Sequence, residues 1–164
     1  MTVDALKRIA PWLALAALLA LADQASKAAI SAHLRVGEVR AVTGFFNLVL
    51  AHNRGAAFSF LSDAGGWQRA LFIAIAVIAT AVIVAMLARH SQERLFSAGL
   101  ALILGGALGN LWDRIALGHV VDFLDFHALG WHFWAFNLAD SAITVGAGLL
   151  ILDGVLQARA SRKP

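Results

Sequence analysis

Four polar residues interrupt a long apolar run near the C-terminal end of this 164-residue chain: Asn137, Asp140, Ser141 and Thr144. Their spacing of i, i+3, i+4 and i+7 predicts that they share one face of a helix. An aspartate in a membrane helix is costly unless it faces a cavity or a partner. Asp122, in the short loop that we predict before this helix, can supply that partner. Two carboxylates that converge at a membrane surface indicate acid–base chemistry.

Paired carboxylates can hydrolyse a peptide bond without a metal or a cofactor. Two close carboxylates cannot both ionise cheaply, so they share a proton. One can then take a proton from water while the other protonates the carbonyl oxygen or the leaving amine. Transporters also have aspartates within the membrane. At this point the residues leave three classes open: a hydrolase, a transporter or channel, and a structural subunit.

Two other catalytic classes are disfavoured by the residues present. A serine protease would use Ser141, but no predicted span contains a histidine and there is no G-x-S-x-G elbow. A zinc site would use the histidines and carboxylates between His119 and His132, but no H-E-x-x-H pair occurs there. The chain has no cysteine, which excludes thiol nucleophiles and disulfides. We therefore expect neither a metal nor a cofactor.

The composition predicts an integral-membrane protein. Hydrophobic residues make up 60% of the chain and charged residues 14%, against about 25% charged in globular proteins. Four apolar runs approach the roughly 20 residues that span a bilayer; they cover about 9–30, 70–88, 95–112 and 133–152. We expect an all-α membrane protein in which residues 1–164 form one domain with four transmembrane helices. The alternative for the first run, a cleavable signal peptide ending at 20–22, is disfavoured because the apolar pattern continues past Asp23.

Basic residues at the ends of the runs predict the orientation. The formal net charge of +3 comes from residues at these ends, which indicates membrane topology rather than a nucleic-acid partner. The side that holds both termini has the higher density of basic residues: Lys7, Arg8, Arg89, Arg94, Arg159, Arg162 and Lys163. We therefore expect cytoplasmic termini, with segments 31–66 and 113–132 outside. Asp122 and Asp140 then lie near the outer face, which favours a hydrolase over a transporter with charges at mid-membrane.

The outer segment 31–66 predicts a small β-rich element. Residues 42–50 are rich in Val, Phe and Leu and indicate a short strand or hairpin. We expect this element to lie on the membrane surface, because Trp67, Trp131 and Trp134 occupy interface positions nearby.

Other polar residues in the spans need partners. Asp23 and Lys27 are four residues apart, which predicts an ion pair on one helical face. Gly105 and Gly109 form a small-xxx-small pair that allows close helix packing. Arg114 could snorkel, pair with Asp113, bind a substrate carbonyl or orient a carboxylate.

Five blocks in order resemble the bacterial lipoprotein signal peptidase family, also called signal peptidase II. The resemblance covers nearly the whole chain, and its motifs are residues 23–27 (DQASK), 53–58 (NRGAAF), 105–114 (GGALGNLWDR), 120–123 (VVDF) and 136–141 (FNLADS). It implies a four-helix membrane aspartyl peptidase that removes signal peptides from diacylglyceryl-modified prolipoproteins, cutting before the lipidated cysteine.

The resemblance also implies roles for individual residues. It implies a catalytic dyad of Asp122 and Asp140 and a set of residues that bind substrate or support the site: Asn53, Gly55, Asn110, Arg114, Asn137, Asp23 and Lys27. Asp113 and Asp125 are near the dyad in sequence, so either could be mistaken for one of its members. The implied location is the bacterial inner membrane. The implied partners are lipid-modified prolipoproteins, membrane lipid and a globomycin-like inhibitor, and a monomer suffices for the mechanism.

Overall fold

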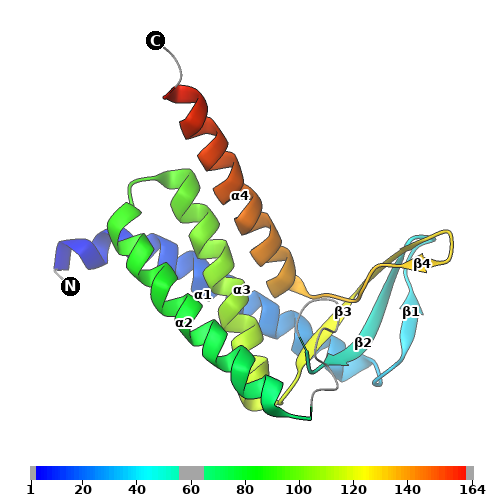
Figure 1. The fold of residues 1–164 in the computed structure, drawn as a ribbon. Helices are drawn as coiled ribbons and strands as arrows, with labels where there is room; N and C mark the ends of the chain where they lie inside the picture. Colours follow the sequence, from blue (N-terminus) through cyan, green and yellow to red (C-terminus); the bar gives the residue numbers. More distant parts are fainter. Residues whose placement is uncertain (1–2, 56–64, 162–164) are drawn as a thin grey trace.

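Four long apolar helices form the body of the protein. The computed structural model describes residues 3–55 and 65–161. Within these residues it has four helices long and apolar enough to cross a membrane: α1 (Val3–His33), α2 (Trp67–His90), α3 (Arg94–Ala116) and α4 (Leu138–Ala160). A small sheet projects from one end of the helices (Figure 1). The predicted fold class, four membrane helices with a small β-rich element, is confirmed.

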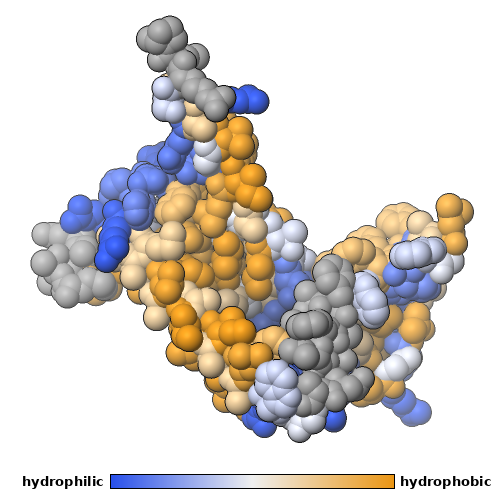
Figure 2. Space-filling model, in the orientation of Figure 1, coloured by the Kyte–Doolittle hydropathy of each residue, from blue (hydrophilic) through white to orange (hydrophobic). Residues whose placement is uncertain are grey.

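The central helix is α3, which packs against the other three helices. In an apolar stretch of 18 residues of α3, half is buried inside the protein, against 11–17% in the corresponding stretches of the other helices. The outward faces of α2 and α4 carry exposed apolar side chains such as Ile78 and Ile151. Apolar residues dominate the helical surface seen in Figure 2, while hydrophilic residues gather at the helix ends away from the sheet and where the helices meet the sheet. This distribution suits helices that face lipid and a polar site at one end.

Glycines bring α3 close to its neighbours. A Cβ on Gly105 would lie 2.8 Å from the carbonyl oxygen of Ala16, and one on Gly109 would lie 2.5 Å from Oδ2 of Asp23. The predicted small-xxx-small pair therefore packs against α1. On the α4 side, a Cβ on Gly106 would collide with the carbonyl oxygen of Ala139. These contacts hold the polar residues of three helices within hydrogen-bonding reach.

The sheet is antiparallel and has the order β1-β2-β3-β4. Its strands are β1 (Val39–Ala41), β2 (Phe46–Asn53), β3 (Val120–Ala128) and β4 (Trp131–His132). The strand or hairpin predicted at 42–50 corresponds to the first part of β2 and the turn before it, whereas β1 lies just ahead of the predicted range. The prediction that Asp122 lies in a loop is wrong, because Asp122 lies in β3 and pairs with Ala51 of β2. This pairing joins segments far apart in sequence, so the local pattern of residues did not reveal it.

The start of the fourth helix differs from the prediction. We expected it near residue 133, but α4 begins at Leu138. Asn137 is extended (φ −134°, ψ −175°) and caps the helix, so it precedes the helix rather than lying on its polar face. Phe136 exchanges backbone hydrogen bonds with Leu124 of β3. The apolar residues before Asn137 therefore extend the sheet instead of the membrane helix.

Candidate active site

Asp122 is a buried carboxylic acid on β3. Its side chain is 3% exposed. Nδ2 of Asn53, at the end of β2, donates to Oδ2 of Asp122 at 3.0 Å. Nδ2 of Asn137 donates to the other oxygen, Oδ1, at 2.7 Å. Both carboxyl oxygens thus have an amide donor, and the side chain is held from two sides.

Asp140 lies in the first turn of α4 and is half-buried. Nδ2 of Asn110 donates to its Oδ1 at 2.8 Å. The backbone N–H of Asn137 donates to its Oδ2 at 3.3 Å, and the backbone N–H of Asp140 donates to Oδ1 of Asn137 at 2.9 Å. This reciprocal arrangement is a capping box. A carboxylate at a helix N-terminus is also favoured by the helix dipole.

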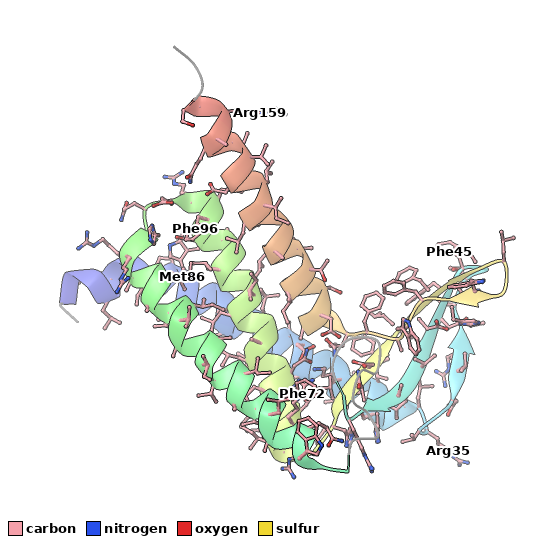
Figure 3. The ribbon with its side chains drawn as sticks, in the orientation of Figure 1. Arg35, Phe45, Phe72, Met86, Phe96 and Arg159 are labelled. Atoms are coloured by element: carbon pink, nitrogen blue, oxygen red, sulfur yellow. The ribbon has the colours of Figure 1, made fainter. Side chains whose placement is uncertain are left out.

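The two aspartates line the same cavity, which has a volume of about 750 Å³. Asn53, Asn110 and Arg114 contribute polar groups to it. Ser141 and Thr144 of α4 also line it. Most of the remaining wall is apolar and comes mainly from α2, α3 and α4; these side chains include Phe72, Ile75, Ala76, Ile103, Ala107, Ile143 and Val145. Phe72 lies at the sheet end of α2 (Figure 3). The cavity therefore combines an apolar groove with a carboxyl pair at its polar end, as a site for an apolar chain would.

The environment of Asp122 favours its protonated form. Burial, and after it the negative charge of Asp140, raise the pKa of Asp122 from 3.8 to about 7. Hydrogen bonds from Asn53 and Asn137 and the positive charge of Lys27 act in the opposite direction on this pKa. A carboxyl group that keeps a proton near neutral pH beside a second carboxyl group can act as a general acid.

A buried ion cluster lies beneath the carboxyl pair. Nζ of Lys27 lies 2.7 Å from Oδ2 of Asp23 and 2.9 Å from Oδ2 of Asp113, and it donates to Oδ1 of Asn110 at 3.0 Å. The predicted Asp23–Lys27 ion pair is confirmed. Asp23 also accepts the backbone N–H of Ala139, at 2.9 Å. The cluster therefore connects α1, α3 and α4 directly below the site.

Arg114 connects the end of α3 to the residues that follow β2. One guanidinium nitrogen donates to the carbonyl oxygen of Gly55 at 2.9 Å, and the group lies 5.1 Å from the ring centre of Phe72. The alternative that Arg114 pairs with Asp113 is not observed, since Asp113 binds Lys27 instead. Gly55 in turn donates its N–H to Oδ1 of Asn53, at 2.9 Å. Ala56, Ala57 and Phe58 of this motif lie outside the described residues.

Two residues that hold neighbouring helices together near the site were missed in the sequence. Gln24 donates to Oδ1 of Asp113 at 2.8 Å and to the carbonyl oxygen of Gly109 at 3.1 Å. Arg69 donates to the carbonyl oxygens of Arg114 and Ile115, at the C-terminal end of α3. Gln24 could have been found from its position in the same motif as Asp23 and Lys27. The sequence contains no local signal for Arg69, because its partners are 45 and 46 residues away.

Asp125 is separated from the carboxyl pair. It is bonded to Nδ1 of His132 at 2.9 Å and to Nδ2 of Asn47 at 2.8 Å. It lines a different cavity, of about 420 Å³. An odd spacing of three residues along a strand places Asp122 and Asp125 on opposite faces.

The sequence and the structure both have close relatives among known proteins. The sequence model of the family described as signal peptidase (SPase) II matches residues 15–156. The lipoprotein signal peptidases of Burkholderia vietnamiensis (strain G4 / LMG 22486) and Burkholderia multivorans (strain ATCC 17616 / 249) are each 60% identical over 154 residues, which cover 94% of this chain and 93% of the relative.

Two solved structures of bacterial membrane enzymes, both obtained by the in meso method, share the fold. The structure at 2.3 Å resolution has a TM-score of 0.83 and 30% sequence identity, with 94% of this chain and 93% of that chain covered. The structure at 1.9 Å resolution has a TM-score of 0.76 and 31% identity, with coverage of 88% and 92%.

Proposed function

The chain belongs to the signal peptidase II family, and from this premise we propose that Asp122 and Asp140 are its catalytic dyad. The enzyme is a membrane peptidase that removes signal peptides from diacylglyceryl-modified prolipoproteins and cuts before the lipidated cysteine. One observation carries the assignment of the dyad: Asn137 donates to both carboxyl groups, from its side chain to Asp122 and from its backbone N–H to Asp140, and both groups line one cavity. The transporter and structural alternatives are therefore set aside.

The dyad hydrolyses the peptide bond by moving protons between its two carboxyl groups. One carboxylate takes a proton from water as the water oxygen bonds to the scissile carbonyl carbon, and the protonated carboxyl group gives its proton to the carbonyl oxygen. The tetrahedral gem-diol then collapses. The C–N bond breaks, the first carboxyl group protonates the leaving amine, and a gem-diol hydroxyl returns a proton to the second. The pair ends as it began, with one shared proton.

The apolar groove supports a role in binding the signal peptide. Its walls come from α2, α3 and α4, so an apolar segment in the groove would lead to the dyad at its polar end. The two acyl chains of the diacylglyceryl group would remain in membrane lipid. Asn110 and Asn53 hold the carboxyl groups, while Arg114 has five N–H groups and can bind a substrate carbonyl as well as Gly55. A globomycin-like inhibitor would compete for this groove.

The position of the site supports an orientation with both termini in the cytoplasm. The sheet and both aspartates lie at one end of the helices, whereas Arg159 lies at the far end of α4 (Figures 1 and 3). Arg89 and Arg94 flank the turn between α2 and α3, which is also remote from the sheet. Placing the basic ends in the cytoplasm puts the dyad near the outer face. We expect residues 1–164 to act as one domain and as a monomer, because one chain supplies both aspartates.

Cleavage of a diacylglyceryl-modified prolipoprotein tests the dyad. We expect Asp122→Asn and Asp140→Asn to lower kcat by at least about a hundredfold, because asparagine keeps the size but cannot exchange the proton. Asp125→Asn is the matched control on β3 and should keep kcat within about threefold. Wild-type kcat in either folded dyad variant would refute the assignment.

A further inference from the structure

Lys27 uses its whole hydrogen-bonding capacity inside the protein. Its side chain is 3% exposed, and its Nζ contacts three oxygens, those of Asp23, Asp113 and Asn110, at 2.7, 2.9 and 3.0 Å. An ammonium group has three donors and no acceptor. Two of its contacts are ion pairs, but the third is with a neutral amide that reaches the dyad.

The contact with Lys27 determines which end of the Asn110 amide faces Asp140. Oδ1 of Asn110 accepts from Lys27 at 3.0 Å and from Nδ2 of Asn137 at 3.2 Å, so Nδ2 of Asn110 points to Oδ1 of Asp140 at 2.8 Å. In the reversed amide, the NH₂ group would face two donors and the oxygen would face a carboxylate. Lys27 and Asn137 therefore both select the orientation that supplies Asp140 with an N–H donor.

The other members of the ion cluster have contacts that explain a packing role. Asp23 accepts the backbone N–H of Ala139, at the start of α4, and Asp113 accepts the backbone N–H of Val121 on β3. Gln24 binds Asp113 and the backbone of α3. In the described part of the chain, Lys27 is the residue of α1 that donates a hydrogen bond to the Asn110 side chain. Lys27 and Gln24 thus share the buried cluster but differ in this contact.

We propose that Lys27 is a positioning residue for catalysis, which acts through Asn110 to hold the Asp140 carboxylate in place. The proposal rests on the dyad proposed above. It assigns Lys27 a role separate from the stability of the cluster, because the Lys27–Asn110–Asp140 chain of contacts ends on a reacting group. The role predicts a loss of kcat with little change in KM, since Lys27 is buried and is not among the described residues that line the cavity.

A double-mutant cycle separates positioning from packing. In the prolipoprotein assay we expect Lys27→Met and Asn110→Ala each to lower kcat about a hundredfold, with KM changed by less than about threefold. Because both changes act on the one hydrogen bond from Asn110 to Asp140, the double variant should lose little more than either single variant. Gln24→Leu is the matched control, and it should lower Tm while keeping kcat within about threefold.

A second pair of variants removes the problem of uncompensated buried charge. Lys27→Met leaves two buried carboxylates without a cation and can prevent folding. The triple variant Lys27→Met, Asp23→Asn, Asp113→Asn has no such charge. Its control is Asp113→Asn alone, in which Lys27 keeps Asp23 as its counterion, so neither variant leaves an unpaired buried charge. The proposal expects the triple variant to have a kcat about a hundredfold below that of this control.

Three results would overturn the proposal: equal kcat in the triple variant and its control, losses that multiply in the double-mutant cycle, or an equal loss of kcat in Gln24→Leu. Asp122→Asn and Asp140→Asn, measured in the same assay, keep the two proposals apart. If these retain activity, the dyad itself is wrong. If they are inactive while Lys27→Met retains its kcat, the positioning role alone is refuted.

Discussion

Nδ2 of Asn137 lies 2.7 Å from Oδ1 of Asp122, so the residue that caps α4 also holds the carboxyl group on β3. The same side chain accepts the backbone N–H of Asp140 through Oδ1, at 2.9 Å. A helix cap thereby sets the position of both members of the proposed dyad. One side-chain amide therefore caps α4 and also binds a residue of the sheet.

Replacement of Asn137 should separate capping from the bridge between the two aspartates. We expect Asn137→Ala to lower the free energy of unfolding by about 1–2 kcal/mol and kcat by at least about a hundredfold. Asn137→Ser keeps an oxygen that can cap the helix but lacks an amide that reaches Asp122. Its Tm should be closer to that of the wild type, while its kcat stays low. Thermal unfolding and the cleavage assay check this, and recovery of kcat in Asn137→Ser would contradict it.

The raised pKa of Asp122 predicts a loss of activity above about pH 7, because the dyad then loses its shared proton. The same shift affects stability. The folded carboxyl group keeps its proton up to about pH 7, whereas the unfolded group loses it near 3.8, so stability falls as the pH rises through this window. Asp122→Asn should flatten the dependence of Tm on pH between about 4 and 7. A wild-type activity that keeps rising well above pH 7 would be inconsistent with this prediction.

Asn53→Leu should move the alkaline limb of the pH–rate profile to higher pH. The hydrogen bond from Asn53 lowers the pKa of Asp122, so its removal raises that pKa further. A hydrogen bond to a charged group contributes about 1.5 kcal/mol or more, which corresponds to a shift of about one pH unit. Asn47→Leu is the control on β2, because Asn47 binds Asp125 instead. A downward shift for Asn53→Leu would show that another group sets this limb.

Gly106→Ala should destabilise the protein by about 1–3 kcal/mol and reduce activity. The added Cβ would collide with the carbonyl oxygen of Ala139 and lie 2.8 Å from Cγ1 of Ile143, so α3 and α4 must move apart next to Asp140. Gly154→Ala is the matched control on α4, where a Cβ has nothing within 4 Å. It should stabilise the helix by about 0.5–1 kcal/mol. Equal Tm values for the two variants would refute the close-packing argument.

Features set by local spacing were predictable from the amino-acid order. Hydropathy over about 20 residues predicted the four spans, and a spacing of four on a helix predicted the Asp23–Lys27 pair, which is confirmed at 2.7 Å. The small-xxx-small glycines likewise predicted close packing of α3. In each case the geometry of one helix relates residue number to position, so no knowledge of the rest of the chain was needed.

Contacts between distant segments required the folded chain. Asp122 and Asp125 have similar neighbours in sequence, but the pairing of β3 with β2 turns Asp122 toward Asn53 and the cavity, whereas Asp125 faces Asn47 and His132. Asp113 lies next to Arg114 in sequence, yet it binds Lys27, 86 positions away, because α1 packs closely on the glycines of α3. The order of the amino acids along the chain specifies which groups are present and which face of a helix each group occupies. The register of the strands and the contact between helices then select which groups meet, and these are properties of the whole packed chain.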